Sequence, residues 1–167
     1  RTSPFSDACN AGDNRKGYVV RSNPEGSQWE LFCAGLRNPY GIAAGPDGEW
    51  FTYDADAEFD MGSPWYRGTR IVHLVSGADY GWRGVTGQWP PYYPDHPDNA
   101  PPLLEIGKGS PTAAVFGTET RFPTEYQRAL FVLDWTYGRV LAIHLAPRGA
   151  GYRAAAETFL QGRPLNV

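Results

Sequence analysis

Several features that define other classes of protein are scarce or missing in this sequence. Its 167 residues include only two cysteines, and no apolar run approaches the roughly 20 residues that cross a bilayer. The 15 basic residues are outnumbered by 18 acidic ones and form no cluster that could neutralise a phosphate backbone. We therefore expect no membrane span in this chain and no nucleic-acid partner. No signal-peptide pattern opens the chain, which begins with Arg1.

The two cysteines, Cys9 and Cys33, are spaced for neither a zinc site nor a redox-active Cys-x-x-Cys pair. Cys9 lies in a polar stretch that could fold back on the strand containing Cys33. A disulfide between them would fit an oxidising compartment. Two buried thiols are the alternative.

Turn-forming and aromatic residues are abundant, with 20 glycines, 15 prolines, 6 tryptophans, 10 tyrosines and 8 phenylalanines. Apolar runs of about four to eight residues are bounded by Gly, Pro, Asn or Asp, which is typical of short strands joined by tight turns. The only helical candidate is the single turn 124–128, which follows Pro123. We predict an all-β chain with strands at 18–22, 29–33, 41–44, 49–53, 70–75, 113–117, 129–134, 140–145 and 155–160.

Parts of the chain also resemble one another. GYVVRSNPEGSQWELFCAGLRNP from Gly17 is similar to GRVLAIHLAPRGAGYRAAAETFLQGRPLN from Gly138, and a related strand begins at Thr69. Repeats of roughly 40 to 50 residues with four strands each are typical of β-propeller blades, although Gly-flanked strands also occur in sandwiches. We predict a partial propeller of about two to three four-stranded antiparallel blades. Because a propeller typically closes with four to eight blades, the remaining blades must come from the same or another chain.

Two segments resemble a known family. GLRNPYGIAAGPDGEWFTYDAD, followed by TRIVHLVSGADYGWRG, is similar to the β-propellers of the soluble glucose and sorbosone dehydrogenases that use pyrroloquinoline quinone. The resemblance implies a six-bladed ring, with residues 17–167 as a partial propeller and residues 1–16 as an N-terminal extension. It also implies a quinone cofactor, calcium and a sugar substrate.

A bacterial subgroup of large secreted proteins, in which such a propeller is joined to a c-type cytochrome, resembles the chain more closely. The segments that carry this likeness are DADAEFDMGSPWYRGTR, GSPTAAVFG and ALFVLDWTYGRVLAIHL. This resemblance implies a periplasmic or secreted protein with a possible haem partner.

The resemblance places three residues beside the quinone. Arg37 and Asn38 match an Arg and Asn on the carboxylate and carbonyl edge of the cofactor, and a guanidinium suits a planar carboxylate because it binds in a bidentate manner. Thr112 matches a residue beside the cofactor on the next inner strand. The alternative for Arg37 and Asn38 is that they cap the loop before the strand. The chain departs from the family pattern at Tyr40, which replaces a Gln, and at Thr136, which replaces a cofactor-contacting Lys.

The acidic loop is the predicted metal site. The acidic residues Asp54, Asp56, Glu58 and Asp60 stand at every second position, so in an extended strand their carboxylates would repel one another. A hard cation that prefers oxygen ligands would remove this repulsion, and calcium is the natural candidate. The resemblance adds backbone carbonyls to this site. The predicted ligands are Asp54, Ala55, Asp56, Ala57, Glu58 and Asp60. A solvated acidic loop paired with Arg67 and Arg70 is the alternative.

No catalytic residue is predicted in this chain. Spacing fixes no nucleophile or carboxylate beside His73, His96 or His144, and the family's catalytic histidine lies N-terminal to the matched segments. Two functions therefore stay open. The chain is either part of a dehydrogenase propeller that passes electrons to a haem partner, or a non-catalytic propeller scaffold or binding subunit of a larger periplasmic or membrane-associated complex.

Overall fold

The structure is a computed structural model that describes residues 17–56, 58, 61–64, 66–82 and 98–162. The chain forms two compact units. The first consists of residues 1–37, 59–66 and 75–101, and the second of residues 38–58, 67–74 and 102–167. The predicted N-terminal extension, residues 1–16, lies outside the described residues.

The described part of the first unit is built on a hairpin of β1 (Val19–Ser22) and β2 (Trp29–Cys33). Oδ1 of Asn23 accepts hydrogen bonds from the backbone N–H groups of Ser27 and Gln28, and these bonds close the turn between the two strands. After β2 the chain continues beside residues 77–82, where Tyr80 N–H donates to the Ala34 carbonyl.

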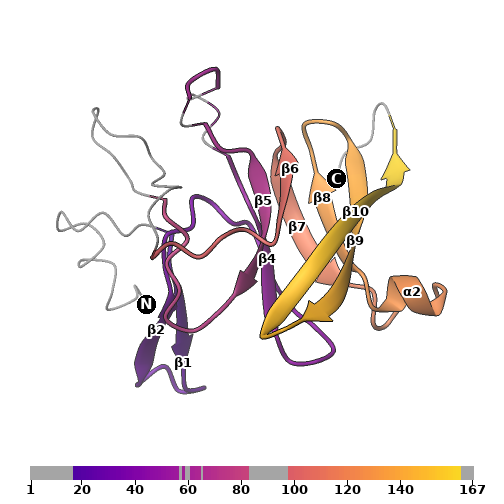
Figure 1. The fold of residues 1–167 in the computed structure, drawn as a ribbon. Coiled ribbons are helices and arrows are strands. Elements are labelled where there is room, and N and C mark those ends of the chain that lie inside the picture. Colours follow the sequence, from indigo (N-terminus) through magenta and orange to yellow (C-terminus); the bar gives the residue numbers. More distant parts are fainter. Residues whose placement is uncertain (1–16, 57, 59–60, 65, 83–97, 163–167) are drawn as a thin grey trace. The chain divides into compact units, whose positions relative to one another are not determined.

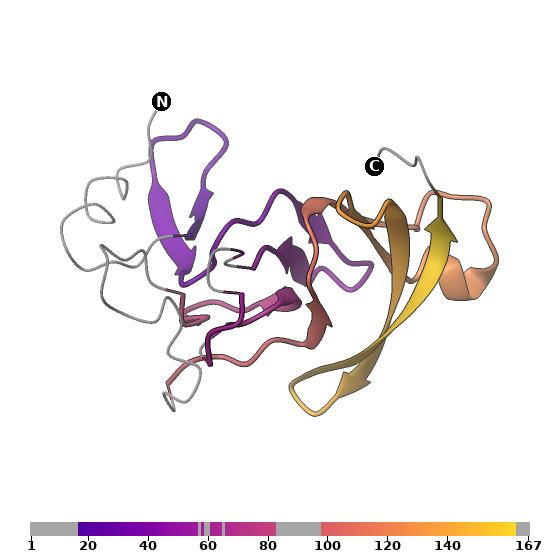
Figure 2. The same ribbon diagram turned by 90° about the horizontal axis from the view of Figure 1, so that it is seen from above.

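The second unit contains two antiparallel four-stranded sheets (Figures 1 and 2). The first blade sheet has the order β3-β4-β5-β6, and the second has the order β7-β8-β9-β10. The strands of the first are β3 (Ile42–Ala44), β4 (Trp50–Asp54), β5 (Thr69–Leu74) and β6 (Leu104–Gly107). The strands of the second are β7 (Pro111–Phe116), β8 (Leu130–Asp134), β9 (Arg139–Arg148) and β10 (Gly151–Gln161).

The core of the second unit lies between these two sheets. Alternation along each strand aims one set of side chains inward, so Leu130 and Val132 of β8 join this core while Phe131 points to the other face. The buried core residues are Ala43, Phe51, Tyr53, Ile71, Phe116, Leu130, Val132, Leu141 and Ile143. Two sheets packed face to face, each in simple meander order, are two adjacent propeller blades.

The other face of the second blade sheet carries α2 (Thr124–Gln127), a single turn that begins after Pro123 (Figures 1 and 2). Tyr126 of α2 packs on Phe131 and Ala142, and its ring also contacts Phe159. The described residues include no helix that is long and apolar enough to cross a membrane.

The structure confirms the predicted all-β partial propeller and its repeat. Two of the three predicted repeats start at Thr69 and Gly138. β5 begins at Thr69 and β9 begins at Arg139, and each is the third strand of its four-stranded sheet. The β1–β2 hairpin corresponds in sequence to β9–β10, the third and fourth strands of the second blade sheet. One described strand, β6, was absent from the sequence prediction.

Candidate functional site

The side chains at one end of the first blade sheet are held by a buried carboxylate. Asp54, the last residue of β4, is 0% exposed, and its Oδ1 accepts the backbone N–H of Asn38 at 2.8 Å. Its Oδ2 accepts hydrogen bonds from Nε of Arg70 at 3.1 Å and from Nη2 of Arg70 at 3.0 Å. Arg70 is the cross-strand partner of Asp54 at the start of β5. The carboxylate thus connects the segment that leads into the inner strand β3 with the beginning of the third strand.

The second blade sheet repeats this arrangement. Asp134, the last residue of β8, is also 0% exposed, and its Oδ1 accepts the backbone N–H groups of Ser110 at 2.9 Å and Thr136 at 3.2 Å. Its Oδ2 accepts Nε of Arg139, its cross-strand partner, at 2.8 Å. We call the end of the two sheets that carries both carboxylates the site end.

A tyrosine lies between the two sheets at the site end. The Tyr53 hydroxyl is 3.0 Å from the hydroxyl of Thr69, which donates to the Gly107 carbonyl at 2.8 Å. A Cβ on Gly109 would lie 2.9 Å from Asp134 Oδ2 and 3.0 Å from the Tyr53 hydroxyl, so only glycine permits this close approach. Burial raises the pKa of Tyr53 to about 12.

This burial predicts a loss of stability in alkaline solution. The folded state holds the Tyr53 proton more tightly than the unfolded chain, whose tyrosine pKa is near 10. The stabilisation is therefore complete below about pH 10 and is lost as the pH rises through about 12, by about 2–3 kcal/mol in total. Urea unfolding measured across this range should show a shallower pH dependence for Tyr53→Phe. The exposed Tyr40, changed to Phe, is the matched control, and equal slopes for all three proteins would contradict the assignment.

The predicted quinone-binding residues lie at or beside the start of the inner strands. Asn38 is exposed and stands before β3, while Thr112 is in β7, where its hydroxyl donates to the Leu133 carbonyl at 3.3 Å. Arg37 is half-buried and precedes Asn38 as the last residue of the first unit. Tyr40, which replaces a family Gln, is 77% exposed. Asn38 thus lies in the segment that leads into β3, and Thr112 lies near the start of β7.

The described part of the acidic loop does not fit a calcium site built around Asp54. Both oxygens of Asp54 already accept hydrogen bonds, and the partner at Oδ2 is itself a cation, Arg70. Among the described residues, no three His, Cys, Asp or Glu side chains come together as a metal-binding group. Asp56 is buried and Glu58 is exposed, whereas Ala57 and Asp60 lie outside the described residues.

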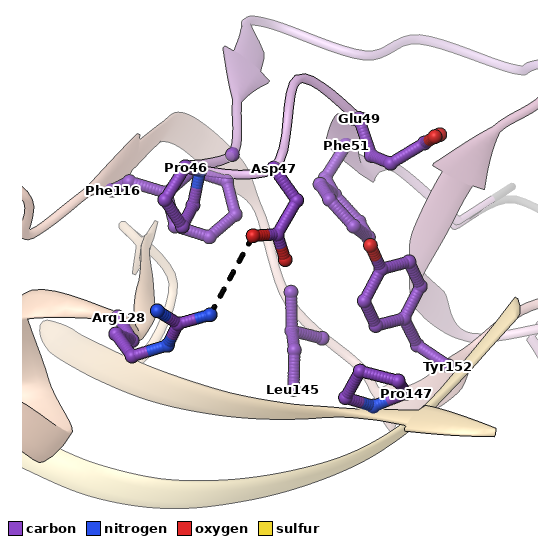
Figure 3. Close-up of a pocket in the computed structure, with 10 residues that line it drawn as sticks. Pro46, Asp47, Glu49, Phe51, Phe116, Arg128, Leu145, Pro147 and Tyr152 are labelled. Atoms are coloured by element: carbon purple, nitrogen blue, oxygen red, sulfur yellow. Dashed lines mark ion pairs between the residues drawn. The ribbon is translucent and has the colours of Figure 1, made fainter.

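The opposite end of the second unit has a shallow hollow that the sequence did not indicate. Figure 3 shows aromatic and aliphatic walls with an exposed ion pair, Arg128 to Asp47 at 3.6 Å, across the rim. The hollow is lined by Gly45, Pro46, Asp47, Glu49, Phe51, Phe116, Arg128, Leu145, Pro147 and Tyr152. Its enclosed part, about 30 Å³, holds only one or two water-sized groups.

Two histidines have carboxylate partners that sequence spacing could not reveal. His73 Nε2 is 2.8 Å from Glu49, and its ring stacks on Phe51 with centroids 5.0 Å apart. His144 Nε2 is 3.2 Å from Glu157. The partners lie 24 and 13 residues away and meet because adjacent antiparallel strands bring them together. Both pairs lie on strand surfaces away from the site end.

Cys33 is a buried free thiol at the end of β2, and burial raises its pKa to about 11. Cys9, the other half of the disulfide alternative, lies outside the described residues. A thiol with such a pKa is protonated near neutral pH and is therefore a poor nucleophile.

Comparison with known proteins agrees with this architecture. No family model matches the chain, and no curated protein matches it. Solved structures do match, and they confirm the resemblance to the soluble glucose and aldose sugar dehydrogenases, whose fold this chain shares.

Three of these structures show the extent of the similarity. An oxidoreductase of Thermus thermophilus described as a glucose dehydrogenase is 25% identical over 80% of this chain, with a TM-score of 0.59. The aldose sugar dehydrogenase of Streptomyces coelicolor bound to pyrroloquinoline quinone is 17% identical over 93% of it, with a TM-score of 0.64. The soluble aldose sugar dehydrogenase of Escherichia coli in its apo form is 17% identical over 81%, with a TM-score of 0.57. The chain spans 36%, 45% and 38% of these proteins, respectively.

Proposed function

We propose that this chain is part of a sugar or alcohol dehydrogenase-like propeller and that its site end holds one edge of a quinone cofactor. The observation that carries the proposal is the position of Asn38 in the segment that leads into β3 and of Thr112 in β7, in a fold shared with a quinone-bound sugar dehydrogenase. Arg37 is adjacent to Asn38 in the chain and supplies the positive charge that a carboxylated quinone requires.

Each residue has a distinct part in this proposal. The Arg37 guanidinium binds a carboxylate of the cofactor through paired N–H donors, which fixes its orientation as well as its charge. The Asn38 amide binds a carbonyl edge, and Thr112 lies beside the cofactor on β7. When bound, the quinone accepts the two electrons that the substrate loses. The proposal assigns no proton acceptor to this chain, because the resemblance places that histidine outside the matched segments.

The proposed partners are further propeller blades, in the same or another chain, and a c-type cytochrome domain that receives the electrons. Exposed apolar side chains on the outer face of the second blade sheet support the first of these, since a neighbouring blade would bury them. They are Val115, Phe122 and Phe159, which are 55%, 39% and 37% exposed. A periplasmic or secreted location fits a sugar substrate of this kind. Calcium at the predicted ligands other than Asp54 stays a prediction.

Quinone binding tests the proposal. We expect pyrroloquinoline quinone to bind the chain with a dissociation constant in the micromolar range, and Arg37→Ala to weaken binding by about 10- to 100-fold because a charge-assisted pair is lost. Fluorescence titration measures both constants. Arg21→Ala is the matched control, because Arg21 pairs with Glu30 on the exposed surface of the β1–β2 hairpin.

The scaffold alternative makes the opposite prediction. If the propeller serves only as a structural or binding subunit, the chain should show no saturable quinone binding, and Arg37→Ala should behave like the wild type. Sugar oxidation by the chain alone does not separate the two functions, because neither assigns it a catalytic base.

A further inference from the structure

We propose that Asp54–Arg70 and Asp134–Arg139 are two equivalent latches, in which a buried aspartate and an arginine of the third strand hold the segment that leads into each inner strand without a metal ion. Asp54 is then a positioning residue and not a calcium ligand. Asp134, to which neither the sequence nor the resemblance assigns a role, is its counterpart in the next blade.

The two latches share their main geometry, although Arg70 binds through both Nε and Nη2 and Arg139 through Nε alone. Each aspartate ends the second strand of its sheet and is fully buried, and each arginine is its cross-strand partner at the start of the third strand. Oδ1 accepts a backbone N–H and Oδ2 accepts the guanidinium in both cases. Two independent occurrences in one chain indicate a feature of the blade and not an accident of one loop.

The backbone groups that the latches hold are also equivalent. Asn38 and Ser110 each stand directly before a proline, Pro39 and Pro111, and the residue before proline is restricted to extended conformations. In each blade the aspartate accepts the backbone N–H of this residue before proline. In the second blade, Gly109 allows the chain to approach the carboxylate closely enough for this bond.

Charge explains why a cationic side chain lies beside each buried aspartate. An ionised carboxylate that is removed from water is costly unless a cation and further hydrogen-bond donors compensate it. A calcium ion could supply that charge, but the Arg70 guanidinium already does so through Nε and Nη2. The arginine is covalently part of the chain, so the opening of the inner strand stays ordered whatever the calcium concentration.

The latches are relevant to the proposed function because of where they act. Asp54 holds the backbone of Asn38 itself, and Asp134 holds Ser110, two residues before Thr112. The inference does not depend on that function, however, since the order of a backbone N–H is measurable without any cofactor. Absence of quinone binding with both latches intact would count against the proposed function alone.

Amide hydrogen exchange of the full chain, followed residue by residue by NMR, tests the latches. We expect Arg70→Met, which keeps side-chain length but removes charge, to speed exchange at Asn38 by about 100-fold or more while leaving Ser110 unchanged. Arg139→Met should do the reverse. Arg70→Lys, which retains the charge, should preserve most of the protection. Exchange at both amides in wild type should be the same in EDTA and in millimolar calcium.

Arg128→Met is the matched control in the same unit, because it removes an arginine from an exposed ion pair and should change neither amide. Equal effects of Arg70→Met and Arg70→Lys would show that packing and not charge acts here, and would overturn the proposal. So would a calcium-dependent change at Asn38 or Ser110. If Arg70→Met does not fold, the less buried Arg139→Met provides the same comparison at Ser110.

Discussion

Replacement of Phe51 by alanine is expected to destabilise the second unit by about 3–5 kcal/mol. Phe51 is 1% exposed and lies in the core between the two blade sheets. Its ring meets Phe116 edge-on at a centroid distance of 5.6 Å and Tyr152 at 5.4 Å. The truncation removes these contacts and leaves a cavity that neighbours on two different sheets cannot readily fill. Urea unfolding followed by circular dichroism measures the change.

Trp50 is the matched control for this substitution. It precedes Phe51 on β4, but it is 46% exposed and points to the opposite face. Trp50→Ala should therefore cost less than about 1 kcal/mol. Equal destabilisation by the two substitutions would show that the blade sheets are not packed through Phe51, and the two-blade arrangement of the second unit would have to be abandoned.

The second large effect is expected in the first unit, for Gly17→Ala. Gly17 has a φ of 63°, which disfavours any side chain, and an added Cβ would run into the backbone carbonyl of Leu36. The Leu36 N–H also donates to the Gly17 carbonyl at 2.9 Å, so the two segments cannot separate without losing this bond. Strain and collision together should cost about 3 kcal/mol or more.

Gly26→Ala separates the two causes. Gly26 has nearly the same φ, 65°, but nothing lies within 4 Å of its added Cβ. This variant should show only the conformational strain, about 1 kcal/mol. Thermal unfolding of the two variants gives the comparison, and similar losses at both positions would mean that Gly17 is not packed against Leu36.

Much of the fold could be predicted because its strands are short, bounded by turn residues and repeated. β2 was predicted to the residue, since WELFC stands between a polar turn and Gly35. The sequence does not predict β6, although its residues alternate, because the run is only four residues long and follows a proline-rich stretch of sequence. β10 begins four residues earlier than predicted, at Gly151, because Tyr152 and Ala154 pack against the core between the sheets.

The candidate site was predicted less completely, for a physical reason. The spacing of Asp54, Asp56 and Glu58 indicates carboxylates in need of a cation, and the sequence names Arg70 as one alternative partner. Only strand pairing shows that Arg70 lies opposite Asp54. The signal was nevertheless present twice, since an aspartate ends one strand and an arginine starts the next at both Asp54–Arg70 and Asp134–Arg139. Periodicity along one strand cannot report such a cross-strand pair, whereas comparison of the two blades could have done so.

NMR mapping of bound cofactor tests most directly whether the site end of the two blade sheets holds the quinone. Titration of isotope-labelled chain with pyrroloquinoline quinone should shift the backbone amides of Asn38, Ser110 and Thr112. The amides that line the hollow at the opposite end, such as Asp47 and Tyr152, should stay in place. Shifts confined to that hollow, or no saturable shifts at all, would contradict the claim.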